Sequence, residues 1–273
     1  HGFAYDDAVV EINPRAGEYA LRTEDIVAKI KEVGEECALV FFSGVQYYTG
    51  QAFDIKVLTE AAHSVGAYAG FDCAHAAGNI KMALHDWNVD FAAWCTYKYL
   101  NSSPGGVSGV FVHEKHGNNP DTPRLAGWWG HKESERFQMK KGFIPEPGAA
   151  GWQLSNAPVL AMAAHKASLD MFDEVGMDAL VAKGKLLNTF LEHVVMDAQA
   201  SNDKLEFEII TPAERGCQLS MLTNENGKAL FDYLTERDVI ADWRQPNVIR
   251  LAPVPMYNSF MDVWEFGELL KGF

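Results

Sequence analysis

The stretch VDFAAWCTYKYLNSSPGG, residues 89–106, joins an apolar run to a glycine-rich loop, and the fold can be worked out from it. Its first part, residues 89–95, is apolar enough to form a buried strand. Lys98 follows where the strand gives way to the loop, and ligands of α/β sheets bind at that edge. Because Lys98 stands between Tyr97 and Tyr99, its amine is expected to be partly desolvated, which favours the neutral, nucleophilic form. A single lysine at a strand end is more often a surface residue whose stem packs on its neighbours, so both interpretations stay open at this point.

Composition identifies the broad class of protein. The 273 residues are 48% hydrophobic and 22% charged, which is typical of a globular protein with one large or two ordinary domains. The formal net charge of −14 argues against a nucleic acid or an anionic membrane as partner, but it leaves room for a small anionic ligand in a local basic pocket. No apolar run approaches the roughly 20 residues that span a bilayer. The first residues lack the basic and apolar regions of a signal peptide, so we expect a cytoplasmic protein.

The cysteines and histidines predict no metal site. The cysteines are scattered, which favours reduced core residues over a disulfide framework or a zinc site. His113 and His116 resemble a metal pair only superficially, because positions i and i+3 of a strand face opposite ways, and we expect both on the surface. Neither a Gly-x-Gly-x-x-Gly motif after a strand nor a phosphate-binding P-loop is present. The four cysteines are Cys37, Cys73, Cys95 and Cys217.

The first half of the chain alternates between helical and strand-like patterns. This spacing favours right-handed βαβ units and a mostly parallel sheet. Thr23 is expected to cap the first helix. We predict helices over residues 23–34, 55–64 and 75–83, and strands over residues 38–42, 67–72, 89–97 and 106–113.

The sequence pattern changes in the second half of the chain. A turn-rich region follows residue 116 and contains an aromatic patch between glycines at residues 127–131. From residue 205 strands and a helix alternate, as in a separate α+β domain. We therefore predict two domains, residues 1–165 and 166–273. The expected elements are helices over residues 159–175, 177–195 and 227–237, and strands over residues 207–210, 216–222 and 248–252.

Polar residues at the strand ends predict a cofactor site. Asp72 ends one strand and Lys98 follows the next, so parallel strands would bring a carboxylate and an amine to one crevice. Pyridoxal phosphate requires such a pair, a lysine for the Schiff base and an acid against the pyridine nitrogen. Asp72 could instead cap a following helix. His75 lies where it could hydrogen-bond Asp72, although a single histidine is more often structural.

Three further side chains are candidates for the same crevice. Ser43 ends a third strand, where its hydroxyl could bind a phosphate or simply belong to a turn. Tyr97 offers a phenol for a phosphate oxygen or for proton transfer, unless it only packs. Arg250 stands in an otherwise apolar run, so its charge needs a carboxylate. That carboxylate could belong to a substrate, which suits the fork of the guanidinium, or to an acidic residue of the chain.

Several long motifs resemble one family. Residues 70–79 (GFDCAHAAGN), 85–87 (HDW) and 90–101 (DFAAWCTYKYLN) are similar to the kynureninases, which are pyridoxal-phosphate-dependent hydrolases of fold type I. The resemblance implies an α/β fold with part of a large, mostly parallel sheet domain and a small C-terminal α+β domain. It covers nearly the whole chain and includes residues 42–45, 48–51, 127–131, 155–158, 214–219 and 250–260.

The resemblance implies roles for the residues of the crevice. Lys98 would form the Schiff base with pyridoxal phosphate and move the α-proton. Asp72 would pair with the pyridine nitrogen, and His75 and Ser43 would support the cofactor. Tyr97 would contact the phosphate and could donate a proton.

The resemblance also implies a shared site in a homodimer. Trp128 and Asn156 would complete the cofactor site, at least partly from the neighbouring subunit. His131, and Asn156 again, would lie near the substrate, and Arg250 would bind the α-carboxylate of this amino acid.

The implied reaction is the hydrolysis of L-kynurenine or its 3-hydroxy form to anthranilate or 3-hydroxyanthranilate and L-alanine, a step of tryptophan catabolism and NAD biosynthesis. The family pattern includes a further N-terminal portion, so we expect this chain to be a fragment that binds the cofactor poorly and is inactive alone. Two alternatives are a cysteine desulfurase-like lyase, which needs a mobile nucleophilic cysteine, and an inactive truncated relative that acts as a dimer partner.

Overall fold

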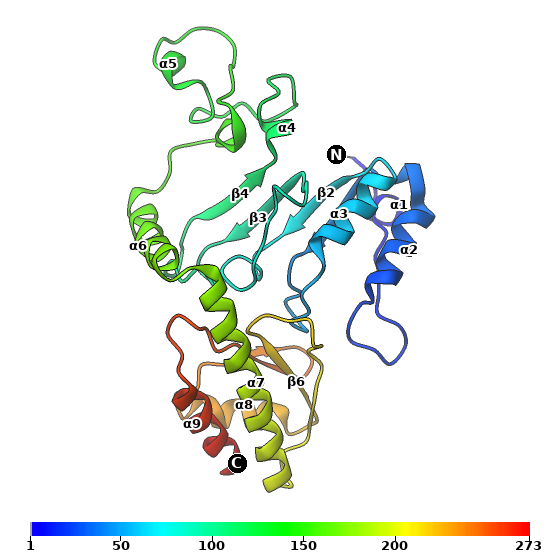
Figure 1. Ribbon diagram of the computed structural model, residues 1–273, viewed down its shortest axis with the longest axis vertical. Coiled ribbons are helices and arrows are strands. Elements are labelled where there is room, and N and C mark those ends of the chain that lie inside the picture. The colour runs from blue at the N-terminus through cyan, green and yellow to red at the C-terminus, as the bar shows by residue number, and fades with distance from the viewer. Residues whose placement is uncertain (1) are drawn as a thin grey trace.

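A four-stranded sheet organises the first half of the chain in the computed structural model, which describes residues 2–273 (Figure 1). Helices α2 and α3 pack beside this sheet, with α3 in contact with β1 and β2. The elements are α1 (Tyr5–Ala8), α2 (Thr23–Val33), a 3-10 turn η1 (Gly34–Glu36), β1 (Leu39–Ser43), α3 (Ile55–Ser64), β2 (Tyr68–Asp72), β3 (Phe91–Cys95) and β4 (Ser108–Val112), and the strand order is β1-β2-β3-β4.

The register of this sheet places the strand ends side by side. Strands β1, β2 and β3 are parallel, and Ser43 pairs with Asp72, which in turn pairs with Ala93. The expected parallel sheet is therefore present, but β4 runs antiparallel to β3. The connection, residues 96–107, contains no helix, and it brings the chain back beside β3 in the opposite direction.

Two local expectations are wrong. Residues 75–83 form successive turns and no helix, because Gly78 adopts a φ of 81° and the carbonyl of Tyr99 lies 2.7 Å from where a Cβ would stand. Thr23 is the first residue of α2, and the cap position is Arg22, which makes no side-chain cap bond.

The two faces of the β1–β4 sheet differ. One face packs against α2 and α3, where Ile26, Leu58 and Phe71 are fully buried. On the other face, alternate residues of the strands remain exposed, as the two-residue period of a strand requires. Parallel sheets are generally covered on both faces, so this one presents an unusually apolar open surface. Its exposed side chains include Leu39, Phe41, Tyr68 and Val110.

A segment of mostly irregular structure, residues 113–157, follows β4, and we call it the lobe. It contains α4 (Glu114–Gly117), α5 (Glu133–Arg136) and the 3-10 turn η2 (Gly148–Trp152), and it projects from one end of the sheet (Figure 1). Helix α6 (Val159–Val175) returns along the sheet, and α7 (Met177–Ser201) leads into the second half. The domain boundary expected at residues 165/166 falls inside α6 and stays a prediction.

A second sheet, entirely antiparallel, forms the C-terminal part. Its order is β5-β6-β8-β7, and it packs with α7, α8 and α9 around a core that includes Leu187, Met221 and Ile249. Strand β7 and helix α9 are absent from the elements expected from the sequence. The bounds are β5 (Phe207–Ile209), β6 (Leu219–Thr223), α8 (Gly227–Thr235), β7 (Asp242–Arg244), β8 (Val248–Leu251) and α9 (Phe260–Lys271).

All four cysteines are free thiols. Among residues 2–273, no helix combines the length and the apolar character that crossing a membrane requires.

Candidate active site

The ends of β1 and β2 form one wall of the candidate site. Ser43 and Asp72 are paired in register, so both side chains lie at the carboxyl edge of the parallel strands. Asp72 is exposed, and its Oδ1 accepts a hydrogen bond of 2.8 Å from the backbone N–H of Ala74. The carboxylate is thus oriented by the turn that follows the strand and remains open to solvent.

Lys98 lies just beyond the end of β3, in a loop that closes on itself. The N–H of Ser102 donates to the carbonyl of Thr96, and the N–H of Asn101 donates to that of Lys98. The half-buried lysine points its Nζ toward His75, at 3.0 Å from Nε2, and lies 5.9 Å from the centre of the Tyr97 ring. Lys98 therefore bonds His75, and the expectation that Asp72 and Lys98 share one ligand stays a prediction.

His75 is neutral in this setting. Burial lowers the pKa of His75 from 6.5 to about 4, and the nearby charge of Lys98 acts in the same direction. Because an ammonium can only donate, the Lys98–His75 bond makes Nε2 the acceptor and leaves the hydrogen on Nδ1. This Nδ1 is buried and has no partner within the described part of the chain. His75 hence bonds to Lys98 and not to Asp72, the partner considered from the sequence.

The lowered pKa predicts a loss of stability in acid. Between pH 6.5 and about 4, the unfolded chain binds a proton at His75 that the folded chain does not, so the free energy of unfolding falls as the pH falls through this window. We expect His75→Gln to weaken this dependence by about 1–2 kcal/mol between pH 7 and 4.5, as measured by urea unfolding. The exposed His193→Gln is the control. An unchanged pH dependence in His75→Gln would contradict the neutral state.

Arg250 reaches the same region from the second sheet. Its Nε donates to Asp242 at 2.6 Å and its Nη1 to the backbone carbonyl of Tyr47 at 2.5 Å, and the side chain is 10% exposed. The positive charge of Arg250 helps to lower the pKa of His75, behind burial and Lys98 in size. Of the two partners considered from the sequence, the internal carboxylate is present, and it is Asp242.

Hydrogen bonds between the two halves of the chain hold His75 and the loop of Tyr47 and Tyr48 against the second sheet. The Asn79 amide donates to the carbonyl of His75 at 2.9 Å, and its oxygen accepts from the N–H of Cys217 at 2.8 Å. Gln218 donates to the carbonyls of Tyr47 and Tyr48. Asn79, Asp242 and Gln218 were not among the residues singled out from the sequence, because each acts through a neighbour that is distant along the chain.

The lobe carries the remaining predicted site residues to the other end of the sheet. Val112, the last residue of β4, pairs with Phe91, the first residue of β3, so the lobe begins at the edge opposite Lys98. Trp128 is 43% exposed and packs edge-on against Phe137 in the lobe. Within one chain, Trp128 therefore does not join Lys98.

His131 is also held within the lobe, where its Nδ1 accepts from the N–H of Ile144 at 3.0 Å. Asn156 is exposed in the segment that leads to α6, and its part in the site stays a prediction. The structure thus groups Ser43, Asp72, His75, Lys98 and Arg250 at one end of the sheet, with Tyr97 beside them, and leaves Trp128 and His131 in the lobe.

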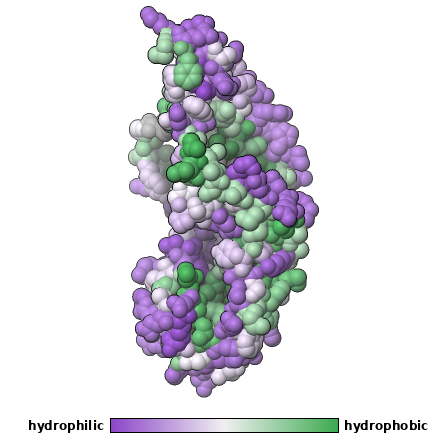
Figure 2. Space-filling model, turned by 90° about the vertical axis from the view of Figure 1, so that its left-hand side faces the viewer, coloured by the Kyte–Doolittle hydropathy of each residue, from purple (hydrophilic) through white to green (hydrophobic). Residues whose placement is uncertain are grey.

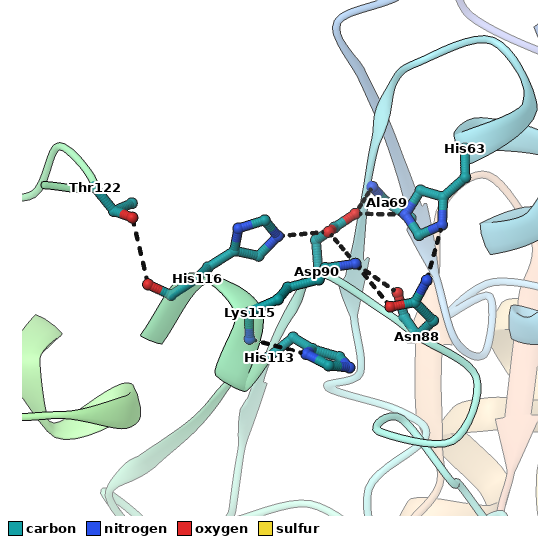
Figure 3. Close-up of polar contacts among 8 residues, drawn as sticks. All are labelled: His63, Ala69, Asn88, Asp90, His113, Lys115, His116 and Thr122. Carbon is teal, nitrogen blue, oxygen red and sulfur yellow. Dashed lines mark hydrogen bonds and ion pairs between the residues drawn. The ribbon is translucent and has the colours of Figure 1, made fainter. Parts of the chain in front are cut away.

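The expectation that His113 and His116 lie on the surface is wrong for His113 and holds only in part for His116, whose side chain is 25% exposed. His113 is 8% exposed and precedes α4, and His116 donates from Nε2 to Asp90 at 2.6 Å (Figure 3). The two residues lie at a helix start and not on a strand, which removes the argument that they face opposite ways. No group of three or more side chains suited to a metal ion occurs in residues 2–273.

Comparison with known proteins agrees with this architecture. Residues 8–215 match the family model Aminotransferase class-V, and residues 180–270 match the model Kynureninase C-terminal domain. The chain is 57% identical to a kynureninase of Flavobacterium johnsoniae over 274 residues, which is 99% of this chain and 64% of that protein. It is 49% identical to a kynureninase of Nematostella vectensis, covering 99% of this chain and 60% of that protein. The chain therefore spans less than two thirds of the length of these relatives.

Solved structures share the fold at low sequence identity. The cysteine desulfurase CsdA of Escherichia coli has a TM-score of 0.74 and 17% identity over 93% of this chain and 63% of that one. A cystine C-S lyase, C-DES, has a TM-score of 0.76 and 16% identity over 91% of this chain and 64% of that one. These likenesses confirm the expected α/β fold of type I. Since the first family model covers most of its length, the chain belongs to the aminotransferase class-V family.

Proposed function

We propose that the protein is a kynureninase, which hydrolyses L-kynurenine or 3-hydroxy-L-kynurenine to anthranilate or 3-hydroxyanthranilate and L-alanine. The observation that carries the proposal is the grouping of Lys98, Asp72 and Arg250 around His75, in a chain 57% identical to a named kynureninase. The proposal places the protein in the cytoplasm, in tryptophan catabolism and NAD biosynthesis.

The residues of the crevice fit pyridoxal phosphate. The fit rests on an exposed carboxylate, Asp72, a lysine amine, Lys98, and a buried N–H of His75 without a partner in the described residues. Lys98 would hold the cofactor covalently, Asp72 would bind its pyridine nitrogen, and Ser43, His75 and Tyr97 would bind its oxygens. When bound, this cofactor supplies an electron sink for a carbanion at the substrate α-carbon.

The chain's own groups move the protons. Lys98 would be the base for the α-proton, and neutral His75, which accepts a hydrogen bond from its ammonium form, would keep the amine oriented. The exposed phenol of Tyr97 stands 5.9 Å from the amine, measured from its ring centre, and is a candidate proton donor. Water then has access to the γ-carbonyl, because this edge of the sheet is open to solvent.

Arg250 would bind the substrate α-carboxylate. Its guanidinium is already held by Asp242 and by the carbonyl of Tyr47, so it is pre-oriented, and a substrate carboxylate would compete with Asp242 for its donors. Two neighbouring contacts, from Asn79 and Gln218, keep the second sheet at the correct position for this exchange.

We also propose a homodimer in which the lobe of one subunit completes the site of the other. The proposal is supported by the start of the lobe at the sheet end opposite Lys98, since the lobe carries Trp128 and His131. The accessible surface of 15497 Å² exceeds the roughly 11,700 Å² of a compact protein of this mass, which supports a large contact. Figure 2 shows apolar patches on the side where α6 lies, and the exposed side chains of α6 include Val159, Leu160 and Met171.

Mixing two inactive variants tests the shared site. In the protein expressed from its complete natural reading frame, Lys98→Ala damages the lysine side of a site, and Trp128→Ala with His131→Ala damages the lobe side. If the sites are shared, half of the randomly mixed dimers carry one intact site, and activity returns to about a quarter of the wild-type value. We expect this recovery after mixing and refolding. Activity that stays at the level of the separate variants would show that each chain builds its own site.

The direct test of the function is the release of anthranilate. The complete protein, loaded with pyridoxal phosphate, is incubated with L-kynurenine, and anthranilate is followed by its fluorescence while alanine is quantified. Equal amounts of both products support the proposal. The 3-hydroxy substrate, assayed in parallel, measures the preference for a ring hydroxyl. An absence of turnover with both substrates would exclude a kynureninase.

The thiols do not favour a cysteine desulfurase-like lyase. Burial raises the pKa of Cys73 and of Cys217 to about 12, so neither supplies a thiolate at neutral pH. Cys95 is the last residue of β3 and thus is held in the sheet. Sulfide release from L-cysteine, assayed beside anthranilate release, separates this lyase and the inactive dimer partner from the proposed enzyme.

A further inference from the structure

A buried carboxylate at the sheet end opposite Lys98 collects four donors. Asp90 is 3% exposed, and its Oδ2 accepts from the Nε2 of His63 at 2.8 Å and from the N–H of Ala69 at 2.7 Å (Figure 3). Its Oδ1 accepts from Lys115 at 2.7 Å and from His116 at 2.6 Å. These partners hold the pKa of Asp90 well below its usual range, even though burial acts in the opposite direction.

The two oxygens of Asp90 serve different elements. His63 belongs to α3 and Ala69 to β2, so Oδ2 is bonded within the body of the large sheet. Lys115 and His116 belong to α4, the first element of the lobe, so Oδ1 bonds the lobe to that body. The backbone adds one further bond, from the N–H of His113 to the carbonyl of Asp90.

Close backbone approaches connect α4, through η2, with the loop of residues 127–131, which carries Trp128 and His131. A Cβ on Gly117, the last residue of α4, would stand 2.8 Å from the Cα of Gly148, so α4 and η2 touch backbone to backbone. A Cβ on Gly130 would stand 2.8 Å from the carbonyl oxygen of Gly151, in η2. Gly130 lies between Trp128 and His131 in the sequence. Because α4 packs on η2 and η2 packs on Gly130, a shift of α4 would move both side chains, since tightly packed backbones leave little room for relaxation.

We propose that Asp90 is a positioning residue, whose carboxylate anchors α4 to the sheet and thereby fixes the loop that carries Trp128 and His131. This inference rests on the proposed function for its effect on turnover, but its effect on the lobe is independent of it. Asp90 touches neither cofactor nor substrate, and it acts on the site that the lobe completes in the neighbouring subunit.

The test distinguishes the role of the Oδ1 partners of Asp90 from that of the Oδ2 partners. The double variant Lys115→Met with His116→Gln removes both Oδ1 partners, together with the bonds of Lys115 to Asn88, and leaves the backbone bond from His113 to Asp90 in place, so α4 is loosened. The matched control, His63→Gln, removes an Oδ2 partner on α3 and leaves α4 bonded. Asp90→Asn, which affects both sides, is the third variant, and the double variant keeps the proposal testable if Asp90→Asn fails to fold. All are made in the complete protein with its cofactor bound.

Hydrogen–deuterium exchange is the first measurement. In the double variant, we expect the backbone amides of residues 113–131 to exchange about tenfold faster or more, while those of β1 to β3 keep their wild-type rates. The His63→Gln control should leave residues 113–131 unchanged. Wild-type exchange of the lobe in the double variant, or equal acceleration in the control, would overturn the proposal.

Steady-state kinetics with L-kynurenine is the second measurement. Because Lys98 itself is unchanged and the lobe is loosened but keeps Trp128 and His131, we expect KM to rise about five- to tenfold and kcat to fall less than KM rises. A faster-exchanging lobe with an unchanged KM would overturn the positioning role. If the wild-type protein itself releases no anthranilate, the proposed function fails, and the exchange result still decides whether Asp90 anchors the lobe.

Discussion

Lys98→Ala is expected to abolish anthranilate release from the complete protein, with a fall in kcat of about a thousandfold or more. The same amine both holds the cofactor and moves the α-proton in the proposed mechanism, so its removal leaves no group at that position to do either. In the structure the Nζ lies 3.0 Å from His75 Nε2, and no other lysine is bonded to this histidine within residues 2–273. The variant should also lose the visible absorption of lysine-bound pyridoxal phosphate.

Lys132→Ala is the control for this experiment, because the Lys132 side chain is exposed in the lobe and its ion pair with Glu135 is long, at 3.9 Å. It should keep both the absorption band and the wild-type kcat. A Lys98→Ala protein that retains the band would show that another amine holds the cofactor, and the assignment of Lys98 would be wrong.

Arg250→Gln should give the second-largest effect, a rise of about 10- to 100-fold in KM for L-kynurenine. The loss corresponds to the charge-assisted hydrogen bonds between a guanidinium and the substrate carboxylate, each of about 1.5–3 kcal/mol. Lys98 keeps its place in this variant, so kcat should fall much less than kcat/KM. Initial rates over a range of substrate concentrations separate the two parameters.

Arg244→Gln is the matched control for Arg250. Arg244 also bonds Asp242, at 3.0 Å, but its side chain is 45% exposed, and it lies on β7 and not on β8. If KM rises equally in both variants, the effect comes from the Asp242 network and not from contact with the substrate. A fall in kcat alone in Arg250→Gln would likewise contradict carboxylate binding.

The sequence predicts the fold well where periodicity is long and the elements are local. The βαβ alternation gives β1, β2, β3 and the helices α2 and α3 within a few residues, because each has a clear apolar pattern. The direction of β4 is missed because the apolar pattern of a strand is the same in either direction. The absence of a helix in the connection is no guide either, since β2 and β3 are parallel and their connection also lacks a helix. Strand β7 has three residues, too few for a period, whereas α9 had a usable signal in the Ser259–Asp262 capping box.

The candidate site is predicted only in part. The sequence shows which residues follow a strand, but it does not show which residues from other parts of the chain bond them. Ser43, Asp72, His75 and Lys98 follow from strand ends, and the structure brings them to one edge. Asp242 stands eight residues before Arg250, and no local pattern indicates that they pair across β7 and β8. Asp90 could have been noticed from the sequence, because it is the single charged residue in the apolar run of residues 89–95. A buried charge needs partners, so the same pattern can be searched for in other chains.

The close glycine contacts of the lobe set limits on sequence change. Irregular surface segments usually tolerate substitution well. Here Gly117, Gly127 and Gly130 each approach another backbone so closely that even a methyl group would overlap it. Residues 113–157 are therefore expected to be as restrictive at these positions as a hydrophobic core, and engineering of this protein is better directed to the exposed positions of α7 and α8.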